Sequence, residues 1–179
     1  YLPRYPHEVS GGQRQRVLIA GAMVLAPQLL LADEPVASLD ASIRGEILAL
    51  MRSLVDDTGI SIVAVTHDLG LAWNIADRIA VMYLGRIVEI APAQQLYRNP
   101  RHPYTQALIS AIPVPDPRRR NQRILLSGDV PSPISPPPGC HFHQRCPHAG
   151  ERCRSQSPKL DPCAGETHLV ACHFPLPLQ

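Results

Sequence analysis

The sequence has 179 residues, of which 45% are hydrophobic, enough for one domain with a sizeable core and an appendage. Its net charge of +2 is too small to attract nucleic acid strongly, so we expect no nucleic-acid partner. No apolar run reaches the roughly 18 residues that a membrane-spanning helix needs, so we expect any membrane contact to go through a partner.

The first predicted element is a helix that begins after a polar and glycine-rich motif. Ser10 is a good N-cap residue, and Gln13 stands at the capping-box spacing from it. We expect a helix over residues 14–26, apolar enough to be buried. Gly11 and Gly12 leave backbone N–H groups uncovered at the positive end of that helix, which suits an anion and above all a phosphate. Taken alone, the motif would favour an ordinary capped helix with glycines for a tight entry.

Strands and helices then alternate along the chain. Short aliphatic runs predict strands of a parallel sheet, and apolar residues at helical spacing predict helices between them. We expect strands at residues 28–32 and 60–66, helices at 41–56 and 69–76, and a β-hairpin over 79–90 that turns at Leu84 and Gly85. This order predicts an α/β architecture with parallel strands followed by a hairpin.

The composition of the chain changes at about residue 99. Fifteen of the 20 prolines lie at or after Pro100, and all five cysteines lie after residue 139. We therefore expect two domains, residues 1–99 and 100–179. In the second we expect a last helix at 103–112, a solvated linker at 113–120 and a polyproline-like spacer at 132–138.

Acidic and imidazole side chains follow the two predicted parallel strands. Asp33 and Glu34 come directly after the first strand, and His67 comes after the second. The same edge of the sheet should therefore present His67 near Glu34. An aspartate at the end of a buried strand can hold Mg²⁺, usually through water. The alternatives are a solvated strand end for the acidic pair and a structural role for the histidine.

Four motifs in this order resemble those of the ABC-type ATPases. They are similar to the signature motif, the Walker B strand, the D-loop and the switch-histidine segment, at residues 10–13, 29–35, 37–40 and 65–68. Further motifs at residues 5–8 and 101–105 resemble the ATP-binding subunits of peptide importers, which include dipeptide, oligopeptide and nickel systems. The resemblance implies an α/β fold: the C-terminal part of an ABC-type P-loop nucleotide-binding domain, with a Pro- and Cys-rich extension.

The resemblance also implies a role for each motif. Glu34 would polarise the attacking water, and His67 would contact the γ-phosphate and link it to that water. Asp33 would hold Mg²⁺. Asp40 would reach across a dimer interface, although it also suits the N-cap of the helix at 41–56. Ser10, Gly11, Gly12 and Gln13 would contact ATP carried by the partner subunit.

The function implied is that of an ATP-hydrolysing subunit, using ATP and Mg²⁺, which energises import of peptides or a related small solute. Such a subunit would lie peripherally on the cytoplasmic face of the inner membrane. Its partners would be a second ABC ATPase subunit, the same or related, and transmembrane permease subunits, with an extracytoplasmic solute-binding protein acting indirectly. Two alternatives stay open: a soluble ABC ATPase not tied to transport, and a non-hydrolytic module that senses metal or redox state.

The sequence contains no G-x-x-x-x-G-K-[ST] phosphate loop, which relatives carry upstream of the signature. We therefore interpret the chain as the C-terminal part of a longer protein. We expect the chain alone to bind MgATP weakly and to hydrolyse none. Pairing with a full-length partner would restore at most one composite site.

The five cysteines lack the paired C-x₂-C spacing of a zinc ribbon. Their context resembles the C-terminal extension of peptide-importer ATPases, in some of which four cysteines hold an iron–sulfur cluster. By position the four would be Cys140, Cys146, Cys153 and Cys172, with Cys163 extra. A [4Fe–4S] cluster, a zinc ion and an empty site remain open alternatives.

Overall fold

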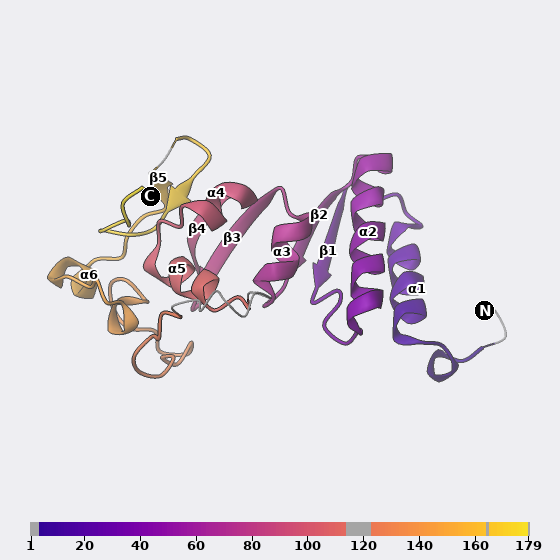
Figure 1. Ribbon diagram of the computed structural model, residues 1–179, viewed down its shortest axis with the longest axis horizontal. Helices are drawn as coiled ribbons and strands as arrows, with labels where there is room; N and C mark the ends of the chain where they lie inside the picture. Colours follow the sequence, from indigo (N-terminus) through magenta and orange to yellow (C-terminus); the bar gives the residue numbers. More distant parts are fainter. Residues whose placement is uncertain (1–3, 114–122, 164, 179) are drawn as a thin grey trace. The chain divides into compact units, whose positions relative to one another are not determined.

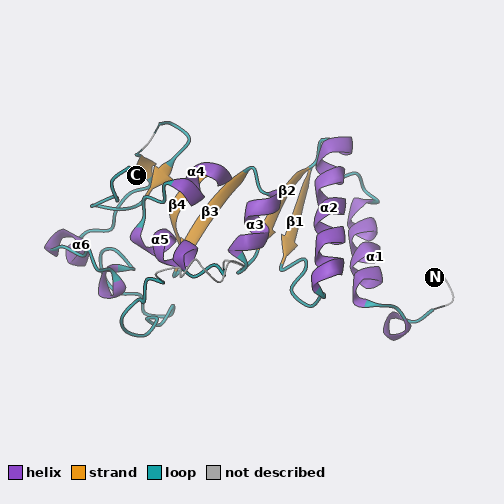
Figure 2. Ribbon diagram, in the orientation of Figure 1, coloured by secondary structure: helices purple, strands orange, loops and turns teal. Residues whose placement is uncertain are grey.

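The computed structural model describes residues 4–113, 123–163 and 165–178. The chain forms two compact units, residues 1–68 and 69–179, which are described separately (Figure 1). Helices and strands alternate in the first unit, whereas the second is built on an antiparallel sheet (Figure 2). The predicted α/β architecture is confirmed. The predicted change of domain at residue 99 falls inside the second unit and stays a prediction.

The first unit contains two helices and two parallel strands. A 3₁₀ turn, η1 (Pro6–Glu8), precedes them. In chain order they are α1 (Gly11–Met23), β1 (Leu29–Asp33), α2 (Ala41–Thr58) and β2 (Ser61–Val65). The strands pair in parallel, with Leu29 opposite Ser61 and Asp33 opposite Val65. Each predicted element is therefore present, with ends that shift by at most three residues.

Helix α2 begins and ends on strong local signals. The Asp40 carboxylate accepts a hydrogen bond from the backbone N–H of Ile43 at 3.0 Å, which caps the first turn. Gly59 ends the helix with φ of 70°, a left-handed conformation that glycine adopts without strain. Between these ends, one face of α2 buries Ile47, Leu48 and Met51.

The expectation that α1 and the first strand are buried is wrong. Val17 and Leu18 of α1 are 61% and 60% exposed, and Leu31 of β1 is 70% exposed. Helix α1 buries only Gly12 and Ile19. An apolar run shows that a segment can be buried, but whether a second layer covers it depends on the other elements present. In this chain one face of the two-stranded sheet has no covering layer among the described residues.

The second unit is organised around strand β4. Its elements are α3 (Leu69–Ile75), β3 (Arg78–Tyr83), β4 (Arg86–Pro92), α4 (Ala93–Arg98), α5 (Pro103–Ser110), η2 (His143–Arg145), α6 (Glu151–Ser155), β5 (Asp161–Pro162) and β6 (Leu169–Val170). The strand order is β3-β4-β6-β5 and all pairs are antiparallel. The predicted hairpin joins β3 to β4 through Leu84 and Gly85, whose φ values of 43° and 73° suit a tight two-residue turn.

The core of the second unit joins the hairpin to the cysteine-rich C-terminal part. Tyr83 and Val88 of the hairpin, Leu96 of α4, and Phe142 belong to one buried cluster, which also includes Cys140 and Cys153. The predicted spacer at 132–138 contains a turn at Pro133 and buries Pro137, so it is partly packed rather than a free polyproline segment. The linker predicted at 113–120 lies, apart from its first residue, outside the described residues. None of the helices in the described parts has the length and apolar content to span a bilayer.

Candidate functional site

Glu34 and His67 meet at the carboxyl ends of β1 and β2. Because β1 and β2 are parallel, the residues that follow them emerge at the same edge of the sheet. The backbone N–H of Glu34 donates to the carbonyl of Val65 at 2.9 Å, which extends the ladder by one residue. Glu34 has φ of 45°, a conformation that is uncommon outside glycine. The turn at Glu34 thus brings its side chain to the residue that follows β2.

The two side chains make a short, direct contact. One carboxylate oxygen of Glu34, Oε1, lies 2.6 Å from Nδ1 of His67 and accepts the backbone N–H of His67 at 3.0 Å. Since an ionised carboxylate only accepts hydrogen bonds, Nδ1 carries a proton and Nε2 is left for another partner. The hydrogen bond from the His67 side chain lowers the pKa of Glu34 below its usual value. Glu34 is therefore an ionised acceptor at neutral pH.

The pair is open to an incoming ligand. The side chain of His67 is 79% exposed and that of Glu34 is 34% exposed. Asp33, the last residue of β1, is also exposed beside them. The structure thus places all three residues predicted from the two strand ends at one solvent-accessible edge.

The signature motif has the predicted cap. Ser10 Oγ accepts from the backbone N–H of Gln13 at 3.3 Å, and Gln13 Oε1 accepts from the backbone N–H of Ser10 at 3.0 Å. Ser10 and Gly11 are exposed. No described residue accepts a hydrogen bond from the N–H of Gly11 or Gly12. The first turn of α1 therefore presents the N–H of Gly11 and the positive end of a helix to solvent.

Gly12 also has a packing role that the sequence did not reveal. It is buried, and a Cβ on this residue would lie 2.5 Å from Cγ2 of Ile43 in α2. A Cβ on Gly11 would lie 3.0 Å from the Leu39 side chain. The two glycines thus permit close approach of α1 to α2 and to the residue Leu39 that precedes it, whatever they bind. Asp40 lies at the start of α2 and caps it, as one of its two predicted roles requires.

The four cysteines of the predicted cluster lie in one region of the second unit. Burial, with smaller contributions from the charges of Cys140, Cys146 and Cys153, raises the pKa of Cys172 to about 12. Cys163 has different neighbours from those of the other four thiols. Burial has the largest effect on its pKa and raises it, and the charged groups that also act on it are Arg101 and Glu89. Within the described residues, however, no three Cys, His, Asp or Glu side chains are placed to hold one metal ion. The donor chemistry suits a cluster, but the thiols are not arranged as ligands.

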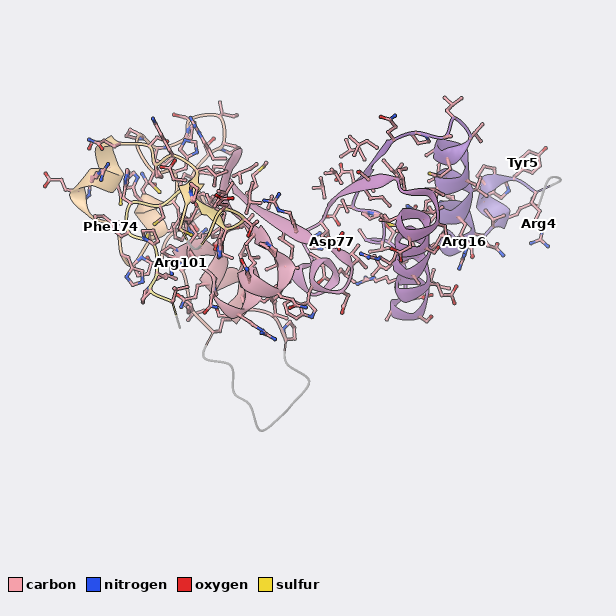
Figure 3. The ribbon with its side chains drawn as sticks, turned by 90° about the horizontal axis from the view of Figure 1, so that it is seen from above. Arg4, Tyr5, Arg16, Asp77, Arg101 and Phe174 are labelled. Carbon is pink, nitrogen blue, oxygen red and sulfur yellow. The ribbon has the colours of Figure 1, made fainter. Side chains whose placement is uncertain are left out.

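A buried polar network in the second unit was not predicted. Glu89 of β4 is completely buried, and Oε1 accepts from the backbone N–H of Arg101 at 2.7 Å and contacts Nε2 of His168 at 2.7 Å. Its other oxygen accepts the backbone N–H of His102 at 2.9 Å. Arg101, labelled in Figure 3, also contacts the C-terminal segment. Its backbone carbonyl accepts a hydrogen bond from the backbone N–H of Leu176. A charge inside the apolar run of β4 was the only sequence signal for this network.

Two family models match the chain. Residues 1–37 match the model described as ABC transporter, and residues 88–153 match that of the oligopeptide/dipeptide transporter, C-terminal region. The first match spans the capped glycine motif, Asp33 and Glu34, and the second spans β4 to Cys153.

The curated relatives are named as ATP-binding proteins of peptide transporters. A probable peptide ABC transporter ATP-binding protein of Sinorhizobium fredii is 52% identical over 97% of this chain and 49% of its own length. The dipeptide transport ATP-binding protein DppF of Escherichia coli is 50% identical over 96% of this chain and 51% of its own length. The chain thus spans about half the length of the curated relatives it matches. A solved structure of cbiO1 from Clostridium perfringens, part of the ABC transporter complex cbiONQ, is 35% identical over 51% of this chain and 36% of its own, with a TM-score of 0.49.

Proposed function

Because the chain is similar along almost its whole length to ATP-binding proteins of peptide ABC transporters, we propose that it carries part of the ATP-hydrolysing machinery of such a transporter. The transporter would import peptides or a related small solute. The observation that carries this proposal is the contact between Glu34 and His67 at the exposed ends of adjacent parallel strands. The relatives' names favour transport over a soluble ABC ATPase with another role.

The roles of the residues follow from their chemistry. Glu34 is ionised, has an accessible side chain, and is held by His67, so it is suited to orient and polarise a water molecule. When both ring nitrogens of His67 are protonated, Nδ1 donates to Glu34 and Nε2 can donate a hydrogen bond to a phosphate oxygen. Asp33 offers an exposed carboxylate at the same edge, of the kind that holds Mg²⁺ beside phosphates. When bound, MgATP supplies the phosphoryl group and the metal charge that hydrolysis requires.

Ser10, Gly11, Gly12 and Gln13 would act on a different nucleotide. Ser10 and Gly11 at this helix end are exposed, which suits the phosphates of an ATP held by a second ATPase subunit. Asp40 would contact that subunit while it caps α2. We further propose that permease subunits anchor the assembly at the cytoplasmic face of the membrane and that an extracytoplasmic solute-binding protein delivers the solute.

The decisive experiment uses the complete gene product that contains this chain, together with its ATPase partner. Glu34→Gln should lower the rate of phosphate release by about 10²-fold or more, the usual contribution of a general base. Glu46→Gln, on α2, is the matched control, because Glu46 only pairs with Arg16 on the surface. A Glu34→Gln enzyme that keeps the wild-type rate would refute the proposal. The 179-residue chain alone should release no phosphate.

We also propose that Cys140, Cys146, Cys153 and Cys172 form the ligand set of a [4Fe–4S] cluster. The charges of Cys140, Cys146 and Cys153 each act on the pKa of Cys172, whereas none of these thiols acts on that of Cys163, which supports this choice. Anaerobic purification should yield iron and acid-labile sulfide, which Cys146→Ser should abolish and Cys163→Ser should preserve. A colourless protein without iron or sulfide would exclude the cluster, and zinc alone would favour the metal-sensing alternative.

A further inference from the structure

One groove in the second unit is lined by none of the cysteines and by none of the residues of the buried Glu89 network. It has a volume of about 230 Å³ and is formed between α5 and residues 123–126, with Arg145 of η2 completing it. Its two walls are held together, because the backbone N–H of Ile124 donates to Oγ of Ser110 at 3.0 Å. We refer to it as the α5 groove.

Two arginines supply the charge of the α5 groove. Arg145 is partly buried, and its Nε is buried without a hydrogen-bond partner among the described residues. Its backbone is fixed by the N–H bond to the carbonyl of Phe142, a core residue that is 1% exposed. Arg123 is exposed and has no acidic partner in the described part of the chain. No described Asp or Glu lines the groove, so neither guanidinium is neutralised there.

The remaining lining is aliphatic. Ala107, Leu108 and Ala111 of α5 face residues 124–126, which are isoleucine and two leucines. No described residue with an aromatic ring lines the groove, so these walls offer no platform for a base. Its volume is below the roughly 300 Å³ at which sites for drug-sized ligands begin. A ligand for this groove is therefore small, negatively charged at one end and aliphatic at the other.

We propose that the α5 groove binds a small soluble organic oxyanion with a short aliphatic chain, of the alkyl phosphate class. The phosphate would accept hydrogen bonds from Arg145 and Arg123, since planar guanidinium groups match the oxygens of phosphate. The alkyl chain would lie against α5 and residues 124–126.

The test is a titration of the full chain with hexyl phosphate by calorimetry. Hexyl phosphate should bind more tightly than inorganic phosphate or hexanol, because only it uses both the arginines and the aliphatic walls. Arg145→Gln and Arg123→Gln should each weaken its binding about tenfold or more, as expected for a lost charge-assisted hydrogen bond. Arg154→Gln, on the exposed face of α6, removes the same charge elsewhere and should leave the affinity unchanged.

Two further measurements keep the proposal falsifiable. Ala111→Phe would fill the groove from an exposed position while both arginines remain, and it should abolish binding. If Arg145→Gln fails to fold by circular dichroism, the exposed Arg123 still provides the charge test. Equal affinity in all variants, no binding of hexyl phosphate, or binding only to phosphatidic acid vesicles would each overturn the proposal.

Discussion

His102 makes the second unit sensitive to acid. The residue is 1% exposed, and its Nδ1 accepts the backbone N–H of Tyr104 at 3.1 Å, which caps α5. Burial lowers the pKa of His102 from 6.5 to about 4. Protonation of Nδ1 would both place a charge in the core and remove the acceptor that caps the helix. The folded protein therefore holds this imidazole neutral.

The direction of the effect follows from proton linkage. In the unfolded chain His102 titrates near 6.5, so below that pH the unfolded state binds more protons than the folded state. The contribution of the neutral imidazole to the free energy of unfolding is fully present above pH 6.5 and is lost as the pH falls toward about 4. At about 1.4 kcal/mol per pKa unit, lowering the pH from about 7 to about 5 should remove about 2 kcal/mol of unfolding free energy.

The assay is urea unfolding followed by the fluorescence of Trp73, the only tryptophan in the sequence. Trp73 packs edge-on against Tyr97 in the same unit as His102, so it reports on the relevant transition. His102→Asn keeps a good N-cap but does not titrate. The variant should be less stable at neutral pH, yet it should lose about 2 kcal/mol less than wild type between about pH 7 and about pH 5.

The exposed His148 provides the matched control. His148→Asn should follow the wild-type dependence on pH. If wild type and His102→Asn lost equal stability over this range, the assignment of the acid sensitivity to His102 would be refuted.

Two further substitutions test the packing of each unit. Gly12→Ala should destabilise the first unit by about 1–3 kcal/mol, because its Cβ would lie 2.5 Å from Ile43 Cγ2. Gly21→Ala is the matched control in the same helix. Because no atom lies within 4 Å of its Cβ position, it should stabilise the helix by about 0.5–1 kcal/mol. Thermal unfolding by circular dichroism would measure both, and similar effects at the two glycines would contradict this reading. Glu89→Gln should cost about 3–5 kcal/mol in urea unfolding followed by tryptophan fluorescence, because it removes the charge from a buried pair with His168 and leaves donors unmatched. A loss below about 1 kcal/mol would show that the network is not needed for stability.

The elements that were predicted well depend on contacts within a few residues. The capping box at Ser10, the cap at Asp40, the glycine end of α2 and the turn at Gly85 each close a local hydrogen bond or relieve a local strain. The meeting of Glu34 with His67 was also predictable, because parallel pairing of two adjacent strands brings their ends together. The catalytic roles of these residues remain predictions from family resemblance.

The features that were missed or wrong depend on residues far apart in the chain. Glu89 meets His168 across 79 positions, and Gly12 meets Ile43 on another helix. The exposure of Val17 and Leu18 depends on which elements pack against α1. The sequence of α1 alone does not specify those elements. The α5 groove likewise combines Arg145 with a helix that ends at Ser110, about 35 residues earlier.

The sequence by itself determined the order of elements, their caps and the identity of the groups at the strand ends, because these depend on short-range sterics and hydrogen bonds. Only the tertiary structure decided which apolar faces are covered, which charges are buried and which arginines lack a partner. Burial and pairing depend on the neighbours that folding brings together, and no local pattern specifies those neighbours.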